Sequence, residues 1–550
     1  MIGIVGGGFA GLAAAYRLQE AGHEVRVFEA ADQVGGLAAT YETRGDRIER
    51  YYHHLSRTEE TIVELAGELG LGDRVEWRIG ENAYYVDGVV HPLDTPWQIL
   101  AYPHLSLYGK FRLGMLTLGI DLRGGRPRRD AYADLEAFED VPVREFLLEH
   151  TTRGVYEYFF EPLLDAKFGD RKDDVSAAWL LGRIQFRGER DPLRGEVLGY
   201  LDGGFGVLVD ELVEAVGREN IETGSYVTDL EYADPPDPPP IVDADRTGVH
   251  ETAGGPRRAD GVGDGGAAGV GDGGAAGVGD EAAAKAGDGP ATGLGDGADA
   301  GGGDRAAQDV DHDHTSGSTY GSTTGSTPDR ARGPVESLTV ARTHDDGERT
   351  TESVDVDAVV VATMPDVLES LTGYDCGIDF QGSVCAVVSM DEPLLDTYWL
   401  NVADDAPFGA LIEHTNFVPP ERYGGEHLLY VASYVQDTDE ELWRLDDEEL
   451  ETLWLDGIED LFPEFDRESV DRFLVARNPK TAPVYERGYL EMVVPYDLGT
   501  AAPGVYYAGM ASRAQYPERS LNGAIEAGYA AADAIIEGDV VAGSTGDGDD

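Results

Sequence analysis

The first 29 residues alternate between apolar runs and a glycine-rich turn. Residues 2–5 form a continuous apolar run, which predicts a buried strand, and residues 12–21 are strong helix formers that end at Gly22. A second apolar run follows at residues 25–28. The pattern predicts a strand, a tight turn, a helix and a second strand, which together form a βαβ unit.

The rest of the chain shows both the helical and the strand periodicity. Residues 95 to about 199 are mostly helical in pattern, with repeated aromatic residues. Before residue 233 we also expect a helix over 57–71, short strands over 75–90 around a turn at Asp87 and Gly88, and a glycine turn and helix before a strand at 226–232. After residue 334 we expect strands within 335–363, at 384–388 and at 427–435, and an acidic helix over 439–462. The last 50 residues have the pattern of a strand, a turn and a helix.

Residues 233–334 break this pattern. They contain proline clusters, glycine, aspartate and alanine runs and a near-repeat of GVGDGGAA, with almost no large apolar side chains to offset the entropy of ordering. We expect this segment to be disordered and to join the two strands of a β-hairpin, the first of which ends near Tyr232. The repeat lacks the aliphatic spacing of calcium-binding β-helices, so an expanded surface loop is the favoured interpretation.

The chain is strongly acidic throughout. Its formal net charge is −63, and residues 233–334 hold only 18 acidic and 7 basic side chains, so most of the acidity lies in the part expected to fold. Basic charge is carried almost wholly by arginine. This composition is typical of a halophilic, haloarchaeal-type protein, because a salt-saturated cytoplasm screens self-repulsion. The lack of a clustered basic footprint argues against nucleic acid as a partner.

No segment has the features of a membrane-spanning or disulfide-stabilised protein. The longest apolar stretch, 111–120, is short and contains Arg112, and the strand pattern begins at Ile2, which leaves no room for a signal peptide. The two cysteines, Cys376 and Cys385, lack CxxC spacing. We expect a cytoplasmic protein without a metal site. The aromatic and apolar segment 96–120 is compatible with shallow membrane contact and equally with core helices.

The glycine turn carries the first candidate site. Gly6, Gly8 and Gly11 stand in G-x-G-x-x-G register between a predicted strand and a predicted helix. The first glycine permits the tight turn, the second lets the backbone approach a pyrophosphate, and the third lets helix and strand pack closely. The helix N-terminus favours the anion, and Glu29, at the end of the second strand, suits the hydroxyls of an adenosine ribose. The unit predicts a dinucleotide but does not separate FAD from NAD.

Two further segments resemble one superfamily. AADQVGGLAAT follows Glu29 and GVYYAGMASRAQYPERSLNGAIEAGYAAADAI lies near the end of the chain. Both are similar to flavin amine oxidases, protoporphyrinogen oxidases and phytoene desaturases, whose FAD fold is shared with UDP-galactopyranose mutase. The resemblance implies FAD as cofactor. With the glycine motif it implies these contacts: Gly6, Gly8, Phe9, Ala10, Gly11, Glu29, Ala30, Gly35, Gly36, Leu37, Val227, Gly509, Met510, Asn522, Gly523 and Ala524.

Two positions depart from the amine oxidase pattern. Leu37 stands where arginine is usual, and Met510 stands where an acidic residue is usual. FAD binding is compatible with both changes, whereas assignment to one subfamily is not supported.

The candidates for catalysis or substrate contact are Tyr52, His53 and His54 in the segment ERYYHHLS. The resemblance places this segment as a strand that passes beside the flavin ring. Neighbouring tyrosines and histidines are equally typical of satisfied core positions.

The implied fold class is α/β. A discontinuous Rossmann-type FAD-binding domain (1–84, 196–232, 335–366 and 491–540) accompanies an α+β substrate domain (85–195 and 367–490), the acidic insertion 233–334 and a flexible tail, 541–550. The implied activity is hydride transfer from a bulky small-molecule substrate, of the amine, porphyrinogen or polyene class, to flavin N5. Neither cysteine lies near the C-terminal flavin motif, so we expect non-covalent FAD.

Two other functions stay open from the sequence. A mutase that isomerises a sugar nucleotide would need paired basic residues, and the spacing of Arg183, Arg187 and Arg190 does not single out a diphosphate clamp. A non-catalytic flavin scaffold is the weakest interpretation, because the chain keeps a complete substrate-side region.

Overall fold

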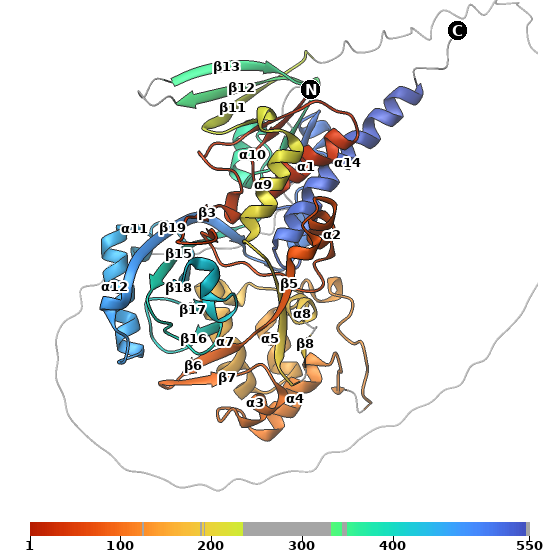
Figure 1. The fold of residues 1–550 in the computed structure, drawn as a ribbon. Coiled ribbons are helices and arrows are strands. Elements are labelled where there is room, and N and C mark those ends of the chain that lie inside the picture. Colours follow the sequence, from red (N-terminus) through yellow and green to blue (C-terminus); the bar gives the residue numbers. More distant parts are fainter. Residues whose placement is uncertain (124–125, 188–189, 192, 235–331, 344–348, 546–550) are drawn as a thin grey trace, which may run out of the picture. The chain divides into compact units, whose positions relative to one another are not determined.

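The computed structural model of this protein describes residues 1–123, 126–187, 190–191, 193–234, 332–343 and 349–545, with side chains up to residue 538. These residues belong to one compact unit made of residues 1–236 and 325–550 (Figure 1). The predicted disordered insertion, 233–334, lies outside the described residues except at its two ends. Residues 546–550 of the predicted tail, 541–550, lie outside them as well, whereas a helix runs to Thr545.

A five-stranded parallel sheet confirms the predicted βαβ unit. Its strands run in the order β10-β2-β1-β14-β20. Strands β1 and β14 are buried along their whole length, which explains why each reads as a continuous apolar run. Helix α1 connects β1 to β2 and packs against helices α9 and α14. The bounds are β1 Ile2–Val5, α1 Phe9–Glu20, β2 Val25–Phe28, α9 Phe205–Val216, β10 Ile221–Glu222, β14 Ala358–Val361, β20 Val505–Tyr507 and α14 Leu521–Thr545.

The predicted hairpin is part of a three-stranded antiparallel sheet, β11-β12-β13 (Ser225–Tyr232, Val335–Thr343 and Arg349–Asp355). Tyr232 pairs with Val335, so the first strand ends where the sequence predicted. The backbone N–H of Ala233 donates to the carbonyl of Pro334 at 2.9 Å. The two ends of the described chain on either side of the insertion are therefore held side by side.

A seven-stranded mixed sheet supports the other half of the unit, in the order β19-β15-β18-β17-β16-β6-β7. Along β15 the side chains alternate: Val384 and Val388 pack under helix α12, whereas Cys385 faces the opposite side of the sheet. The bounds are β6 Asn82–Val86, β7 Val89–Pro92, β15 Phe380–Met390, β16 Trp399–Val402, β17 Ala410–Glu413, β18 His427–Val435, α12 Asp447–Leu461 and β19 Val470–Pro483.

Helices cluster between residues 96 and 186, as the pattern predicted. A small antiparallel sheet, in which β9 lies between β5 and β8, is formed by strands that come before and after these helices in the sequence. The bounds are α2 Glu60–Glu68, β5 Val75–Gly80, α3 Pro96–Ala101, α4 Leu107–Thr117, α5 Val143–His150, α6 Arg153–Val155, α7 Glu161–Phe168, α8 Ala177–Phe186, β8 Arg190–Asp191, β9 Gly195–Leu201 and α10 Pro365–Thr372.

Two local predictions were wrong. The acidic segment 439–462 is not one helix: a short α11 (Glu441–Arg444) stops before Asp446, whose side chain caps α12 in a reciprocal capping box with Glu449. Residues 51–54 do not form a strand either. They follow the two-residue strand β4 (Ile48–Glu49), which pairs with β3 (Thr40–Tyr41), as an irregular segment.

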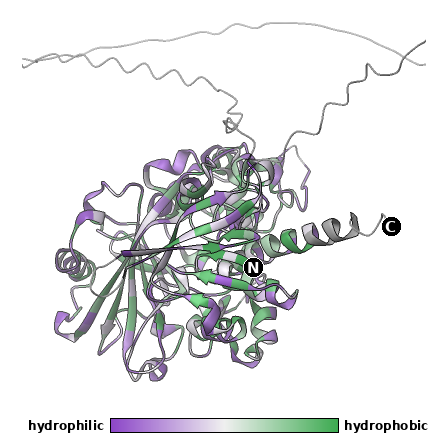
Figure 2. Ribbon diagram, turned by 90° about the horizontal axis from the view of Figure 1, so that it is seen from above, coloured by the Kyte–Doolittle hydropathy of each residue, from purple (hydrophilic) through white to green (hydrophobic). Residues whose placement is uncertain are grey.

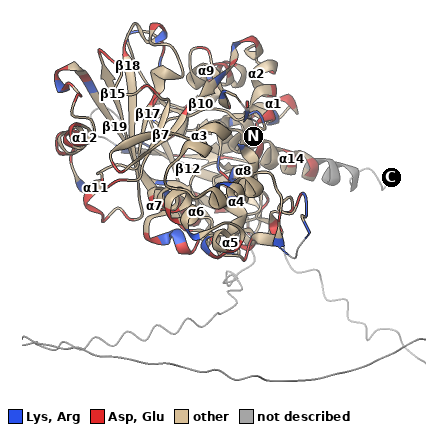
Figure 3. Cartoon of the chain, turned by 90° about the horizontal axis from the view of Figure 1, so that it is seen from below, with Lys and Arg blue, Asp and Glu red and all other residues tan. Residues whose placement is uncertain are grey.

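The distribution of polarity follows the layers. Apolar residues (green) concentrate in the central strands in Figure 2. Acidic residues (red) occur on α2, α12 and α14 in Figure 3 rather than on one face, in line with the spread of negative charge along the sequence. Among the described residues, no helix is long and apolar enough to cross a membrane, and no group of three or more metal-binding side chains comes together.

Candidate active site

The glycine turn after β1 is shaped by close backbone contacts. Gly6 has a φ of +104°, and a Cβ there would lie 2.7 Å from the carbonyl oxygen of Ala362. A Cβ on Gly11 would lie 1.9 Å from the carbonyl oxygen of Gly6. No side chain caps the first turn of α1, so its free N–H groups are available to an anion.

Glu29 fixes the turn from the end of β2. Its carboxylate accepts hydrogen bonds from the backbone N–H of Gly7 at 2.6 Å and of Ala31 at 2.8 Å. Each oxygen keeps a lone pair for a further donor, and Glu29 lines the cavity described below.

A second glycine segment, Gly35 and Gly36, lies directly against the turn that contains Gly7 and Gly8. Gly35 donates its N–H to the carbonyl of Gly7 at 2.8 Å, and a Cβ on Gly36 would lie 3.4 Å from the Cα of Gly8. Gly35 and Gly36 both have positive φ, 113° and 57°, a conformation that glycine adopts without strain.

A cavity of about 410 Å³ joins these segments to the second half of the unit. Its wall includes most of the residues predicted to hold the cofactor: Gly6, Gly8, Phe9, Ala10, Glu29, Gly35, Gly36, Leu37, Gly509, Met510 and Ala524. The wall does not include five other predicted contacts: Gly11, Ala30, Val227, Asn522 and Gly523.

Three of those five make close contacts within the protein. Gly11 allows α1 to lie on the turn. The side chain of Asn522 accepts from the N–H of Ile62 at 2.9 Å and donates to Glu526 at 2.7 Å, which ties α2 to α14. A Cβ on Gly523 would lie 2.6 Å from the carbonyl oxygen of Ala514. Val227 is buried in β11, and Ala30 follows Glu29.

The predicted catalytic residues Tyr52, His53 and His54 all line the same cavity. The ring of Tyr52 meets that of Trp399 edge to face, with centroids 4.9 Å apart. His53 Nδ1 lies 2.7 Å from the carbonyl oxygen of Tyr51, and His54 Nδ1 lies 3.0 Å from the hydroxyl of Tyr398. A carbonyl can only accept, so His53 carries its proton on Nδ1 and Nε2 is left as an acceptor.

Both histidines are neutral near pH 7. Burial, with the charge of Arg519, lowers the pKa of His53 to about 4. Burial, with the charge of Arg187, lowers the pKa of His54 well below its ordinary value. The two rings can therefore accept protons or hydrogen bonds but do not supply charge.

The sequence pointed to Arg183 and Arg187 but not to the charged cluster in the cavity wall that they form with Lys167 and Glu518. Lys167 of α7 and Arg183 of α8 meet Glu518, with N–O distances of 2.7 and 3.4 Å. Arg187 and Arg519 also line the cavity. Two signals were available: lysine is scarce in this chain, and Arg183 and Arg187 are four residues apart, which places them on one helical face.

Cys385 is a further member of the wall. Burial raises the pKa of its thiol well above the ordinary value, so the group stays protonated and is a weak nucleophile. The sequence did not predict a cysteine at the cavity.

The parallel sheet, the glycine turn and the cavity define the class of this molecule as a Rossmann-type cofactor-binding protein. The sequence profile of the flavin-containing amine oxidoreductases matches residues 9–262 and 332–536. The chain belongs to this family.

Curated relatives carry several different activities. A Mycobacterium tuberculosis protein described as a flavin-containing monoamine oxidase, AofH, is 36% identical over 193 residues, which cover 34% of this chain and 41% of that protein. Protoporphyrinogen oxidase 2 of Arabidopsis thaliana is 25% identical over 264 residues, covering 42% and 50%. The matched segments thus span half or less of these relatives.

Solved structures share the fold over almost the whole chain. A protein of Exiguobacterium sp. 255-15 described as a protoporphyrinogen oxidase has a TM-score of 0.63, 16% identity and 98% coverage of both chains. Reduced UDP-galactopyranose mutase has a TM-score of 0.58 and 14% identity, covering 98% of this chain and 95% of that one. At this level of identity the likeness establishes the fold and not the reaction.

The site residues fit the flavin that the family implies. Two glycine segments with positive φ at Gly6, Gly35 and Gly36, an uncapped helix N-terminus and a carboxylate form a cradle suited to a nucleotide pyrophosphate and ribose.

Proposed function

We propose that this protein is an FAD-dependent oxidoreductase that removes hydride from a bulky organic substrate. The observation that carries the proposal is one continuous cavity. Its wall contains the glycines and Glu29 of the βαβ unit and also the aromatic and basic side chains of the second half. Bound flavin supplies a hydride acceptor at N5, and the chain supplies position and electrostatics.

The residues around Tyr52 suit substrate positioning. His53 Nε2 is a neutral acceptor that can take a proton or hold a substrate hydroxyl or amine N–H. Trp399 and Tyr52 present apolar ring surface for a bulky group. The buried sheet beneath them excludes water.

The cofactor is FAD and it is held without a covalent bond. Glu29 at the end of β2 suits the ribose of the adenosine half, which FMN lacks. The one cysteine in the described cavity wall, Cys385, is a protonated thiol. Heat or acid precipitation of the yellow protein should release FAD into the supernatant, identified by chromatography. Release of FMN, or flavin retained in the pellet, would contradict the proposal.

An anaerobic flavin spectrum tests the reaction class. Purified protein is mixed with a panel of amines, porphyrinogens, polyenes and nucleotide sugars, and a parallel set contains dithionite. We expect one organic reductant to bleach the oxidised flavin absorbance, because electrons have no further acceptor without oxygen.

A flavin-dependent sugar-nucleotide mutase is the second candidate. The spacing of the arginines in the sequence did not favour a mutase, but Arg183 and Arg187 both line the cavity and are suited to binding a diphosphate. Isomerisation of UDP-galactopyranose only in the reduced set, with no bleaching in the other, would replace the first proposal by this one.

A further inference from the structure

The cavity wall carries more positive charge than its carboxylates neutralise. Lys167 and Arg183 share the single carboxylate of Glu518. For Arg187 the nearest carboxylate is Glu196, at 3.7 Å, and Glu196 is also 3.6 Å from Arg190. Because a buried charge without a partner costs several kcal/mol, a surplus of this kind points to a ligand of opposite sign.

Arg519 is the least satisfied of these cations. Its guanidinium donates to the hydroxyl of Tyr434 at 3.3 Å. Its Nε is buried and has no hydrogen-bond partner. Within the described chain no carboxylate makes an ion pair with it. Arginine offers a planar fork of donors that matches carboxylate and phosphate oxygens.

Neighbouring groups respond to this positive potential. Burial would raise the pKa of Tyr434, but the charges of Arg519 and Lys167 outweigh it and lower that pKa. Burial likewise opposes ionisation of Glu518, yet Lys167 and Arg183 lower its pKa to about 2. The cluster of Lys167, Arg183, Arg187 and Arg519 therefore carries net positive charge even with Glu518 ionised.

The cofactor's own phosphates do not account for the cluster. The pyrophosphate cradle is made by glycine backbone and the N-terminus of α1. The four cations instead come from α7, the end of α8 and the turn before α14. A purely structural role fits Glu518, which joins these elements, but leaves Arg519 without a carboxylate and Arg187 with only the Glu196 carboxylate that it shares with Arg190.

We infer that the substrate carries an anionic group, a carboxylate or a phosphate, held by Lys167, Arg183, Arg187 and Arg519. The inference rests on the proposed function and narrows its substrate class. An alkylammonium group would meet like charges here, so simple cationic amines are disfavoured as substrates.

Four aromatic probes of one shape test the charge preference: benzoate, phenyl phosphate, neutral benzamide and benzylammonium. Binding is measured at constant KCl by the change in the flavin absorption spectrum and by the thermal unfolding midpoint. We expect both anions to bind at least ~10-fold more tightly than the other two probes, as for hydrogen bonds between charged groups. Arg187→Gln and Arg519→Gln should each weaken the anions ~10-fold. The control is Arg153→Gln, an exposed arginine on α6.

The outcomes separate the two proposals. Protein without flavin would overturn the proposed function, while the thermal midpoint would still report anion binding. Benzylammonium binding as tightly as benzoate, or unchanged anion binding in both arginine variants, would overturn the inference. If phenyl phosphate binds more tightly than benzoate, the anionic group of the substrate is a phosphate; if benzoate binds more tightly, it is a carboxylate. Either result supports the inference.

A different observation concerns the surface of α3 and α4. These two helices contact each other, and together with Leu118, which follows α4, they expose half of the large apolar side chains that are exposed in the described chain. The exposed fractions are 68% for Trp97, 50% for Leu100, 79% for Leu107, 59% for Tyr108, 51% for Phe111 and 67% for Leu118. Monomeric proteins rarely leave such a cluster open to water without a use for it.

The same segment reverses the charge of the chain. Residues 107–130 contain six basic and two acidic side chains, in a protein with a net charge of −63. Arg126, Arg128 and Arg129 are exposed. A combination of aromatic, aliphatic and basic side chains is what a membrane surface with negative headgroups attracts.

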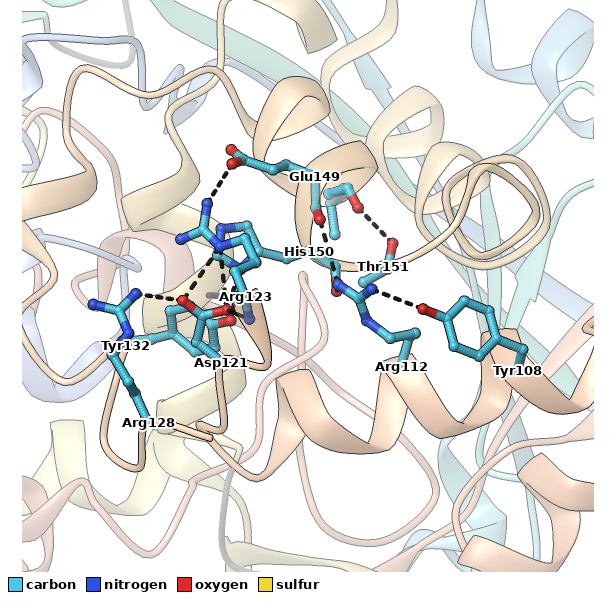
Figure 4. A network of polar contacts seen from close by, with 10 residues as sticks. Tyr108, Arg112, Asp121, Arg123, Arg128, Tyr132, Glu149, His150 and Thr151 are labelled. Carbon is cyan, nitrogen blue, oxygen red and sulfur yellow. Dashed lines mark hydrogen bonds and ion pairs between the residues drawn. The ribbon is translucent and has the colours of Figure 1, made fainter. Parts of the chain in front are cut away.

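A polar network around buried Asp121 and His150 fixes the helix and the basic loop to the same support (Figure 4). Arg112 of α4 donates to the carbonyl oxygens of Glu149 and His150 at the end of α5. Buried Asp121 accepts from Arg123 and Arg128, and Arg123 also pairs with Glu149. The apolar face and the arginines are therefore presented together.

We propose that the face formed by α3, α4, residues 118–123 and residues 126–129 docks shallowly on a lipid bilayer that contains anionic headgroups. The apolar side chains enter the interface and the arginines meet the headgroups. No helix in the described chain crosses the membrane, so the contact is one of surface binding.

Flotation with lipid vesicles tests this docking face. Wild-type protein should float with vesicles of phosphatidylglycerol and phosphatidylcholine and much less with phosphatidylcholine alone. Leu107→Ser with Phe111→Ser should lower the bound fraction several-fold, whereas Leu193→Ser, a control that is 76% exposed elsewhere, should not. No flotation of the wild type, or equal flotation of all variants, would overturn the proposal. The proposal would also be overturned if the wild type is a dimer and the double variant is a monomer, because the face would then bind a second copy of the chain.

Discussion

At the scale of single residues, Glu29 is the sharpest test of the cofactor assignment. Its carboxylate orders the glycine turn through Gly7 and faces the cavity. Glu29→Arg replaces a hydrogen-bond acceptor by a donor, and a donor cannot bind the N–H groups of Gly7 and Ala31. The glycine turn then loses its support, so we expect most of the FAD to be lost on purification. The ratio of flavin to protein absorbance measures this. Glu24→Arg, an exposed charge reversal just before β2, should keep the wild-type ratio; equal loss in both variants would refute the role of Glu29.

His150 gives a pH-dependent prediction. It is buried, its Nδ1 lies 2.6 Å from the hydroxyl of Tyr132, and burial with the charge of Arg123 lowers its pKa to about 4. Between pH 6.5 and 4 the unfolded chain binds more protons, so the stability contributed by the neutral ring is full above pH 6.5 and falls as the pH falls.

His150→Gln should therefore cost more stability at pH 8 than at pH 5. The loss in free energy of unfolding caused by the substitution should be larger at pH 8 than at pH 5 by roughly 2 kcal/mol, which follows from the lowering of the His150 pKa to about 4. Urea unfolding of wild type and variant at both pH values measures it. An equal cost at pH 5 and pH 8 would show that the ring titrates normally in the folded protein.

The sequence predicted single residues where backbone geometry leaves few choices. Gly6 and Gly11 could be recognised because a Cβ at either position would meet a backbone carbonyl oxygen, at 2.7 and 1.9 Å. The group formed by Lys167, Arg183 and Glu518 could not, because Lys167 and Glu518 are 351 positions apart and nothing local marks them as partners.

At the scale of elements, the contact between α1 and α14 depends on small residues. A Cβ on Gly528 would lie 2.3 Å from the carbonyl oxygen of Ala10 and 3.0 Å from the N atom of Ala14. Gly528→Val should push the helices apart, release FAD and lower the thermal unfolding midpoint by several degrees.

Gly538→Val, in the same helix, is the matched control. Its Cβ would meet only the hydroxyl of Tyr506, at 4.0 Å, so both substitutions carry the same helix propensity cost but only one meets backbone. If the two variants unfold at the same temperature, close packing of α14 is not what holds the site together.

The ends of helices and strands were predictable where turn-forming residues such as glycine, proline and aspartate follow them. The turn at Asp87 and Gly88 and the hairpin at Tyr232 appear where the pattern placed them. The acidic segment 439–462 was misjudged because Asp446 looks like one more acidic helical residue, although it is an N-cap.

At the scale of the whole molecule, strand order is set by contacts that no local pattern reveals. Strand β6 pairs with β16 in parallel although more than 300 residues separate them. The periodicity predicted both as strands, but only the three-dimensional packing puts them in one sheet beside the cavity. The division into a cofactor domain and a substrate domain therefore stays a prediction.

The insertion offers a test at this scale. Beside it, the N–H of Ala233 donates to the carbonyl of Pro334 and the N–H of Gly333 donates to the carbonyl of Ala233 at 3.1 Å. Deleting residues 235–331 joins Asp234 to Arg332 and leaves a three-residue loop that ends in glycine, which suits a β-hairpin. Every hydrogen bond of the described hairpin is kept, including that from Arg332 to the carbonyl of Thr372.

We expect the deletion variant to bind FAD in the wild-type ratio and to unfold within a few degrees of the wild type, because the removed segment has too few large apolar side chains to add a core. Flavin absorbance and thermal unfolding at the same salt concentration measure both. A second variant, with ten glycine and serine residues in place of 235–331, separates a strained junction from a lost contribution. If the longer linker also loses flavin, the insertion folds or binds the rest of the chain, and the interpretation as an expanded surface loop is wrong.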